Sequence, residues 1–250
     1  MPAARLHIGT SGWHYKDWVG DFYPAKFKSS EMLSWYSQRF KTVEINNSFY
    51  RLPEERDFKN WKDSVPDHFY FSVKASRFIT HRKRLHDAES ATQKFLSRAQ
   101  LLGEKLGPIL FQLPPNWRVN SQRLEEFLVT LPAKNQYVFE FRDPSWYVPK
   151  IYALLKHHKA ALCLHDWHGS QWPVEFTSNF TYVRFHGSQG SYAGGYSMKH
   201  LQRWAENVLS WQERLAEVFL YFNNDRQGHA VRDAQSLSDL LGQNTQLQVA

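Results

Sequence analysis

Short apolar segments of strand length recur eight times along this chain, and most are followed by a stretch with helical periodicity. The eight segments begin at Leu6, Thr42, Phe69, Ile109, Tyr137, Ala161, Thr181 and Val218. Parallel strands need crossover helices, and right-handed crossovers close such a sheet on itself. The alternation therefore predicts an α/β fold, a TIM-type (β/α)8 barrel that forms a single domain over residues 1–250.

The segments between the predicted strands differ in how clearly their sequences predict a helix. SSEMLSWYSQRF, residues 29–40, predicts an amphipathic helix capped by Ser29 or Ser30, and the helix after the third strand is expected to bury Leu102 and Leu106. DWHGSQWPVEFTSNF, residues 166–180, holds a proline and two tryptophans without amphipathic periodicity, which predicts an irregular sixth crossover. A doubly wound open sheet is the alternative fold, but GTSGWHYKDW lacks its glycine-rich fingerprint.

Net charge, apolar segments and cysteine content indicate where the protein is located and what it binds. The formal net charge of +7 favours an anionic partner. No segment is long and apolar enough to span a membrane, and MPAARLHIG lacks the regions of a signal peptide, so we expect a cytoplasmic protein with no membrane partner. Cys163 is the only cysteine, which excludes disulfide bonds within the chain.

Polar residues follow nearly every predicted strand, where barrel enzymes build their sites. VFEFRDPSW, residues 138–146, places Glu140 and Arg142 two positions apart, so both belong to one face of the strand. We expect that face to point into the barrel mouth. A network of ion pairs that only stabilises the mouth is the other interpretation of any single residue, but polar ends on all eight strands favour a ligand pocket.

These strand ends predict acid and base catalysis without a metal on a small anionic ligand, such as a sugar phosphate or a nucleotide. Glu44 or Glu140 would act as the base, with His186 or His165 as its partner. The predicted catalytic residues are Glu44, Glu140, His186 and Lys74. The predicted ligand-binding residues are Asn46, His81, Gln112, Arg142, His165, Asp166, Arg184, Tyr192, Asn223 and Asn224. Tyr192 belongs to HGSQGSYAGGYS, a glycine-rich segment where barrel enzymes often bind phosphate.

Other chemistries stay open at this stage. Lys74 could instead form a Schiff base. A zinc, manganese or iron site would draw on a mixture of imidazole and carboxylate groups, although no compact ligand motif is present. Those groups are Glu44, His81, Glu140, His165, Asp166, His168 and His186. The basic segment KASRFITHRKRLHD, together with aromatic residues in the loops, indicates nucleic-acid binding or a metal-dependent phosphodiesterase as the alternative function.

Several motifs carry a family resemblance. GTSGWHYKDWVGDFYP, VEINNSFYRLP, FSVKASRFITH, LFQLPPNW, FEFRDPSW, RFHG and YFNND closely resemble domain-of-unknown-function family 72, the YecE-like proteins, from about Ile8 to Leu240. The resemblance implies a barrel related to the TIM type and no particular activity. The residues that match the family pattern are Glu44, Asn46, Lys74, His81, Gln112, Glu140, Arg142, His186 and Asn223.

Overall fold

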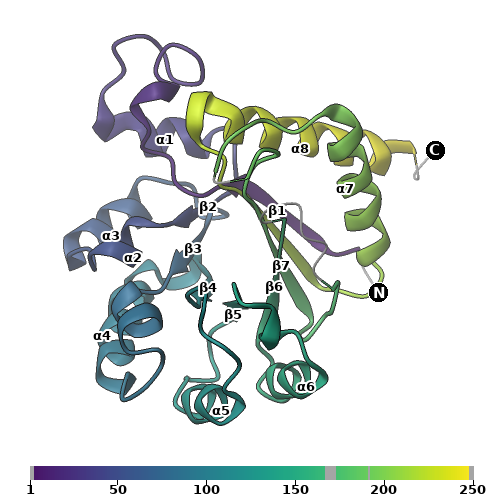
Figure 1. Ribbon diagram of the computed structural model, residues 1–250. Coiled ribbons are helices and arrows are strands. Elements are labelled where there is room, and N and C mark those ends of the chain that lie inside the picture. Colours follow the sequence, from purple (N-terminus) through teal and green to yellow (C-terminus); the bar gives the residue numbers. More distant parts are fainter. Residues whose placement is uncertain (1–2, 167–172, 191, 248–250) are drawn as a thin grey trace. The chain divides into compact units, whose positions relative to one another are not determined.

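The computed structural model of this protein describes residues 3–166, 173–190 and 192–247 (Figure 1). Within these residues, eight strands form one sheet in the order β1-β8-β7-β6-β5-β4-β3-β2. They are β1 (Arg5–Thr10), β2 (Thr42–Ile45), β3 (Tyr70–Lys74), β4 (Leu106–Gln112), β5 (Tyr137–Glu140), β6 (Ala161–His165), β7 (Phe180–Phe185) and β8 (Glu217–Phe222). The protein is a TIM-type (β/α)8 barrel, so the predicted fold class and all eight predicted strands are confirmed.

Helices alternate with the strands. They are α1 (Met32–Ser37), α2 (Asn47–Tyr50), α3 (Glu55–Asp63), α4 (Glu89–Ala99), α5 (Ser121–Val129), α6 (Pro149–His157), α7 (Met198–Trp211) and α8 (His229–Leu247). None of them has the length and apolarity that crossing a membrane requires, as far as the described residues extend.

Two details of the helix predictions were wrong. Ser29 and Ser30 do not cap α1, because both lie inside a 3₁₀ turn and Glu31 precedes the first α-helical residue. Leu106 does not continue the helical face after α4 but begins β4. The cause is Gly103, whose φ of +59° turns the chain out of the helical run.

The sixth crossover is irregular in its described part, since residues 173–179 contain neither helix nor strand. Its residues 167–172 lie outside the described residues. Thr177 ties the described part to the neighbouring strand, because its hydroxyl accepts the N–H of Leu162 (2.8 Å) and donates to the carbonyl of Ala160 (2.7 Å). Side-chain hydrogen bonds thus replace helix packing at this point.

Contacts divide the chain into two compact units. Unit one comprises Met1–Val43, Leu164–Trp172 and Asn179–Ala250, and unit two comprises Glu44–Cys163 and Pro173–Ser178. The prediction of a single domain over residues 1–250 stays a prediction.

In unit two, aromatic residues of β4 and β5 pack against the helix that joins these strands. Phe111 of β4 lies 5.1 Å from Phe127 of α5, measured between ring centroids, and 5.3 Å from Phe139 of β5. Phe111 and Phe139 therefore face the helices. Since side chains alternate along a strand, Gln112 and Glu140 face the opposite side of the sheet, which is the interior of a barrel.

In unit one, the same alternation holds for β7 and β8. Phe185 stacks on Phe222 at 4.3 Å and meets Trp204 of α7 edge-on at 4.9 Å. These rings face the helical layer, so Arg184 and Tyr221, which are register partners, face the interior.

Candidate functional site

The first group of charged side chains lies in unit two, and we call Lys74, His81, Glu140 and Arg142 the Glu140 cluster. An Nη of Arg142 lies 2.5 Å from a carboxylate oxygen of Glu140. The Glu140 side chain is fully buried and that of Arg142 is 4% exposed. The charge of Glu140 is therefore balanced by the arginine two residues further along the chain, and a ligand-binding role of the pair stays a prediction.

The loop after β5 determines where Arg142 sits. The Trp146 ring stacks on Phe141 at 4.8 Å with an interplanar angle of 5°. Asp143 accepts hydrogen bonds from the backbone N–H (3.0 Å) and the hydroxyl (2.6 Å) of Ser145. The motif FRDPSW is therefore a turn whose aromatic residues pack together while its arginine returns to Glu140.

Lys74 and His81 meet at one aromatic ring. The ammonium of Lys74 lies 4.2 Å from the ring centroid of Phe49, and the His81 ring meets Phe49 edge-on at 5.0 Å. Phe49 belongs to α2, the short helix after β2, while Lys74 ends β3 and His81 lies in the π-helical turn Phe78–Arg82. The hydroxyl of Ser48 donates to the carbonyl of Lys74 (2.7 Å), which fixes α2 against the end of β3.

The imidazole of His81 has an unusual proton affinity. Burial, followed by the charges of Lys74 and Arg77, lowers the pKa of His81 from 6.5 to about 4. Arg142 lowers it further and Glu140 opposes the shift. The ring is therefore neutral at pH 7 beside three cations, which is a local excess of positive charge.

One ring nitrogen of His81 is engaged by its neighbour in the chain. The Thr80 hydroxyl oxygen lies 2.9 Å from Nδ1 of His81 and 3.4 Å from the carbonyl oxygen of Ser76. The hydroxyl can donate to either atom, so both tautomers of the neutral ring fit this contact. A neutral imidazole keeps one nitrogen lone pair, so His81 can accept a proton in either tautomer.

A titration of His81 tests this electrostatic description. We expect its side-chain NMR signals to shift with a midpoint of about pH 4, and Lys74→Met to move the midpoint upward because one repelling charge is removed. The folded-state pKa lies below the unfolded value of 6.5, so this group's contribution to stability is present above pH 6.5 and is lost as pH falls towards 4. A midpoint near 6.5 in the wild-type protein would contradict the description.

Three further predicted site residues belong to unit two. Gln112 is the register partner of Glu140, and its Oε1 atom is buried without accepting a hydrogen bond from any described residue. Glu44 is fully buried near the end of β2, and Asn46 is half-buried just before α2. A buried acceptor without a donor is costly, so Gln112 offers a place for a hydroxyl or amine of a ligand.

A second group of polar side chains lies in unit one, at the ends of β6, β7 and β8. Arg184 and His186 are fully buried. Nδ2 of Asn223 lies 3.3 Å from Nδ1 of His186, and the rings of His165 and Tyr192 lie 5.9 and 5.4 Å from the His186 ring. Four of the predicted site residues therefore lie close together in unit one, namely His165, His186, Tyr192 and Asn223.

The other predicted residues of unit one anchor its loops. Asp166 accepts the backbone N–H of His186 (2.7 Å) and the hydroxyl of Tyr196. Asn224 donates to Asp233 of α8 (2.7 Å) and to the carbonyl of Gly194 (3.0 Å). Asn223 and Asn224 follow the end of β8 and have different partners: Asn223 lies beside His186, and Asn224 binds Asp233 of α8.

Both carboxyl groups in this anchor bind protons more tightly than usual. Burial raises the pKa of Asp166, against the opposing hydrogen bonds from Tyr196 and His186. Burial also raises the pKa of Asp233, opposed by hydrogen bonds from Asn224 and Tyr196. The sequence analysis did not single out Asp233. Its spacing could have indicated that it is buried, because Asp233 lies three residues after Ala230 and four residues before Leu237, which are apolar and lie on the buried face of the helix.

The glycine-rich segment after β7 folds back on itself. Gly187 has a φ of +94°, and a Cβ there would lie 2.2 Å from the carbonyl oxygen of Ala193. Only glycine fits this position without a backbone shift. The N–H of Gly187 donates to the Tyr196 hydroxyl (2.8 Å), so at least this glycine serves the turn.

Across the part of the chain that the structure describes, no three His, Cys, Asp or Glu side chains come close enough together to hold a metal ion. His168, one of the candidate ligands in the sequence, lies outside the described residues.

The fold and its strand ends define the class of protein: a TIM-type (β/α)8 barrel with buried charged clusters at the carboxyl ends of its strands. Comparison with known proteins places it more narrowly. The chain belongs to the family described as Protein of unknown function DUF72, whose model matches residues 7–250. The family resemblance of the motifs is thereby confirmed.

Relatives support this placement along nearly the whole chain. The UPF0759 protein YunF of Bacillus subtilis is 27% identical over an alignment of 273 residues, and this alignment covers 94% of each chain. The structure of a DUF72 family protein from Thermotoga maritima is 28% identical, has a TM-score of 0.86, and covers 95% of this chain and 99% of its own. A DUF72 family protein from Enterococcus faecalis shares the fold at 20% identity and a TM-score of 0.82, with 95% of both chains covered.

Proposed function

We propose that this protein is an enzyme that binds a small anionic ligand, a sugar phosphate or a nucleotide, at the Glu140 cluster and moves a proton there. One observation carries the proposal. Burial first, and then the charges of Lys74, Arg77 and Arg142 against that of Glu140, lower the pKa of His81, so a group that can accept a proton lies beside the cations of the cluster. An anion at this place would gain from the charges of Lys74 and Arg142, whose side chains are largely shielded from water.

Each residue has a separate role in this proposal. Lys74 and Arg142 bind the anionic group, for which the guanidinium supplies a planar pair of donors. Gln112 accepts a hydrogen bond from a ligand hydroxyl. Glu140 is a positioning residue, since it acts through Arg142. His81 accepts the proton, and Glu44 is the second candidate base.

Binding and proton transfer are coupled by electrostatics. With a pKa of about 4, lowered by burial and by the neighbouring cations, His81 is a weak base in the ligand-free protein. A bound anion neutralises part of their field, so it raises the pKa of His81 towards its ordinary value. The base therefore becomes stronger only when the ligand is in place.

Isothermal titration with glucose 6-phosphate, AMP, inorganic phosphate and a short single-stranded oligonucleotide tests the proposal. We expect a phosphate-bearing small molecule to bind, and Lys74→Met to weaken that binding about tenfold or more, because a hydrogen bond to a charged group contributes roughly 1.5–3 kcal/mol. The same ligand should raise the midpoint of the His81 titration.

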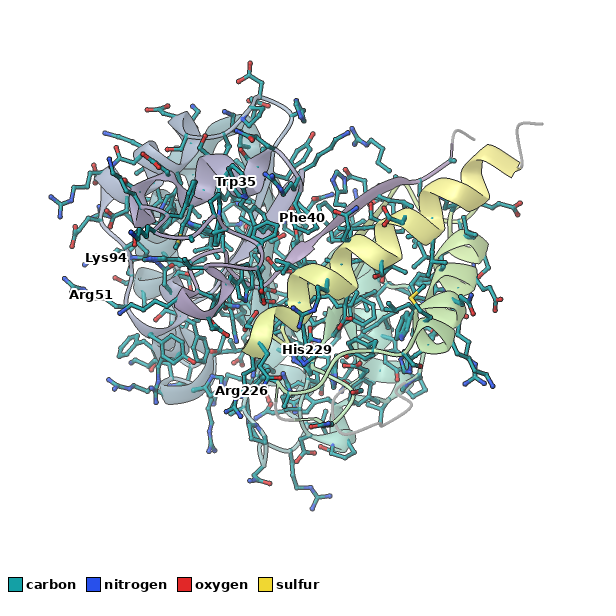
Figure 2. The ribbon with its side chains drawn as sticks, turned by 90° about the horizontal axis from the view of Figure 1, so that it is seen from above. Trp35, Phe40, Arg51, Lys94, Arg226 and His229 are labelled. Atoms are coloured by element: carbon teal, nitrogen blue, oxygen red, sulfur yellow. The ribbon has the colours of Figure 1, made fainter. Side chains whose placement is uncertain are left out.

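Lys94→Met is the matched control. Lys94 lies on α4 of the same unit, is exposed, and points outward in Figure 2, so its removal changes net charge equally without touching the cluster. Equal binding by Lys74→Met and wild type would contradict the proposal, as would the absence of binding by all small ligands. Binding of the oligonucleotide alone, falling steeply with salt, would favour the nucleic-acid alternative.

A further inference from the structure

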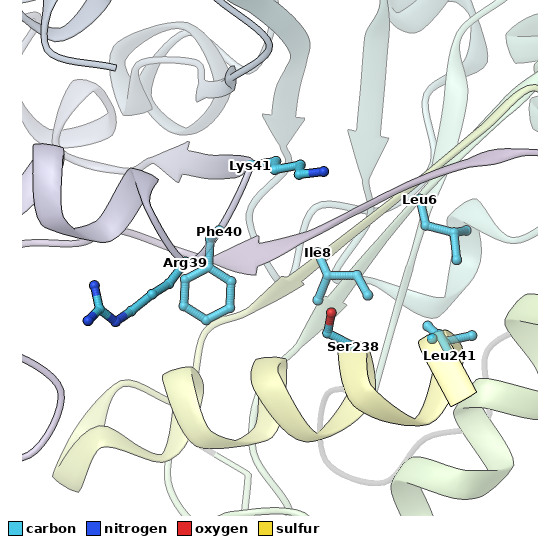
Figure 3. Close-up of a pocket in the computed structure, with 8 residues that line it drawn as sticks. Leu6, Ile8, Arg39, Phe40, Lys41, Ser238 and Leu241 are labelled. Atoms are coloured by element: carbon cyan, nitrogen blue, oxygen red, sulfur yellow. The ribbon is translucent and has the colours of Figure 1, made fainter. Parts of the chain in front are cut away.

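A cavity of about 290 Å³ lies in unit one between β1 and α8 (Figure 3). Its apolar wall consists of Leu6 and Ile8 of β1, Phe40 and Leu241. Leu6 and Ile8 are only half-buried, although strand residues that face the helical layer of a barrel are normally covered. No carboxylate or imidazole is among the described residues that line this cavity.

Two features of the sequence leave this space open. Helix α1 is only six residues long, and the chain then runs without helix from Gln38 to β2. Helix α8 presents Ser238 and Gly242, two small residues one turn apart, towards the cavity. Gly242 is exposed, and a Cβ there would meet no atom within 4 Å, so a larger side chain can be placed at this edge of the cavity.

Two cations flank the apolar wall. Lys41 is exposed, and in Figure 3 its side chain extends along the strand on the Leu6 side. The guanidinium of Arg39 stacks 3.9 Å over the Trp35 ring and donates to the Trp35 carbonyl (3.2 Å). Within the described residues, neither cation has a carboxylate at ion-pair distance. The hydroxyl of Ser238 points from α8 towards Ile8 and adds one polar group.

We infer that this cavity is a second binding site, which takes a small carboxylate with an apolar body. The body packs against Leu6, Ile8 and Leu241, and the carboxylate reaches Lys41. The positive mouth selects an anion over a neutral molecule. The volume is at the lower end of ligand pockets, about 300–1,000 Å³, so it fits a molecule of metabolite size and not a protein segment. This site is independent of the Glu140 cluster.

Equilibrium dialysis with butanoate, hexanoate and octanoate, and with hexan-1-ol as the uncharged analogue, tests the inference. Affinity is expected to rise about fourfold with each added methylene until the cavity is full. Lys41→Met should weaken hexanoate binding roughly two- to fivefold, the range for an exposed ion pair, and leave hexan-1-ol unchanged. Gly242→Phe, which places a ring in the empty space, should abolish binding of both.

Gly242→Ala is the control, because it also replaces a helical glycine but leaves most of the cavity open, so it should bind as wild type does. Circular dichroism verifies that each variant is folded. Octanoate that does not bind the wild type saturably would overturn the inference, and so would undiminished binding to folded Gly242→Phe. Hexan-1-ol and hexanoate that bind equally, without an effect of Lys41→Met, would overturn its anionic part.

Discussion

Replacing Arg142 by alanine is expected to lower the free energy of unfolding by about 3–5 kcal/mol. The reason is the position of Glu140, whose side chain is fully buried and lies 2.5 Å from the guanidinium. Removing the guanidinium takes away a cation that lies in direct contact with a buried carboxylate, so part of the cost of burying that charge is no longer offset. Urea denaturation, followed by circular dichroism, measures the change.

The double variant Glu140→Gln, Arg142→Met is the control for this prediction. It removes both charges, so no uncompensated charge is buried, and it should recover at least half of the stability lost in Arg142→Ala. The His81 midpoint should rise in Arg142→Ala, since one of the cations that lower the pKa is gone. A loss below about 1 kcal/mol in Arg142→Ala would show that the pair contributes little to the fold.

The sequence predicted the barrel because its strands carry a signal that tertiary contacts reinforce. Segments such as VFEF are buried on both faces in a barrel, so a continuous apolar run is a direct consequence of the fold. All eight such runs form strands. The start of α1 was harder to predict, because the choice between a 3₁₀ turn and an α-helix at Ser29 and Ser30 differs by little in local energy.

Side-chain alternation explains which parts of the site could be predicted. Lys74 pairs in register with Leu110, and Gln112 pairs with Glu140, so the period of two places all four on the interior face. Asn223 and Asn224, which the sequence prediction had grouped together, lie beyond the end of β8, and their different partners became evident only in the structure. Alternation thus carries more information about a strand end than polarity alone.

Residues outside the strands could not be placed in this way. His81 reaches Phe49 through a π-helical turn, which has no period that the sequence reveals. Its lowered pKa depends on how closely three cations approach it, and that distance is a property of the folded chain. Sequence motifs identified the residue, whereas its electrostatic environment required the structure.

Replacing Trp146 by alanine is the second change with a large expected effect, about 3–5 kcal/mol in the free energy of unfolding. Trp146 is fully buried, stacks on Phe141, and meets Trp117 edge-on at 5.2 Å. The indole N–H of Trp146 donates to the carbonyl of Trp117. Replacement by alanine removes this donor from the Trp117 carbonyl. Trp146→Phe keeps the stack and loses the hydrogen bond, so it should cost only about 1–2 kcal/mol.

The Trp146→Ala variant also tests whether the loop after β5 positions Arg142. Phe141, on which Trp146 stacks, directly precedes Arg142, so a collapsed loop would move the guanidinium away from Glu140 and from His81. The His81 midpoint should then rise in Trp146→Ala and stay near about 4 in Trp146→Phe. Loss of stability with an unchanged midpoint would mean that Trp146 stabilises the fold without holding the arginine.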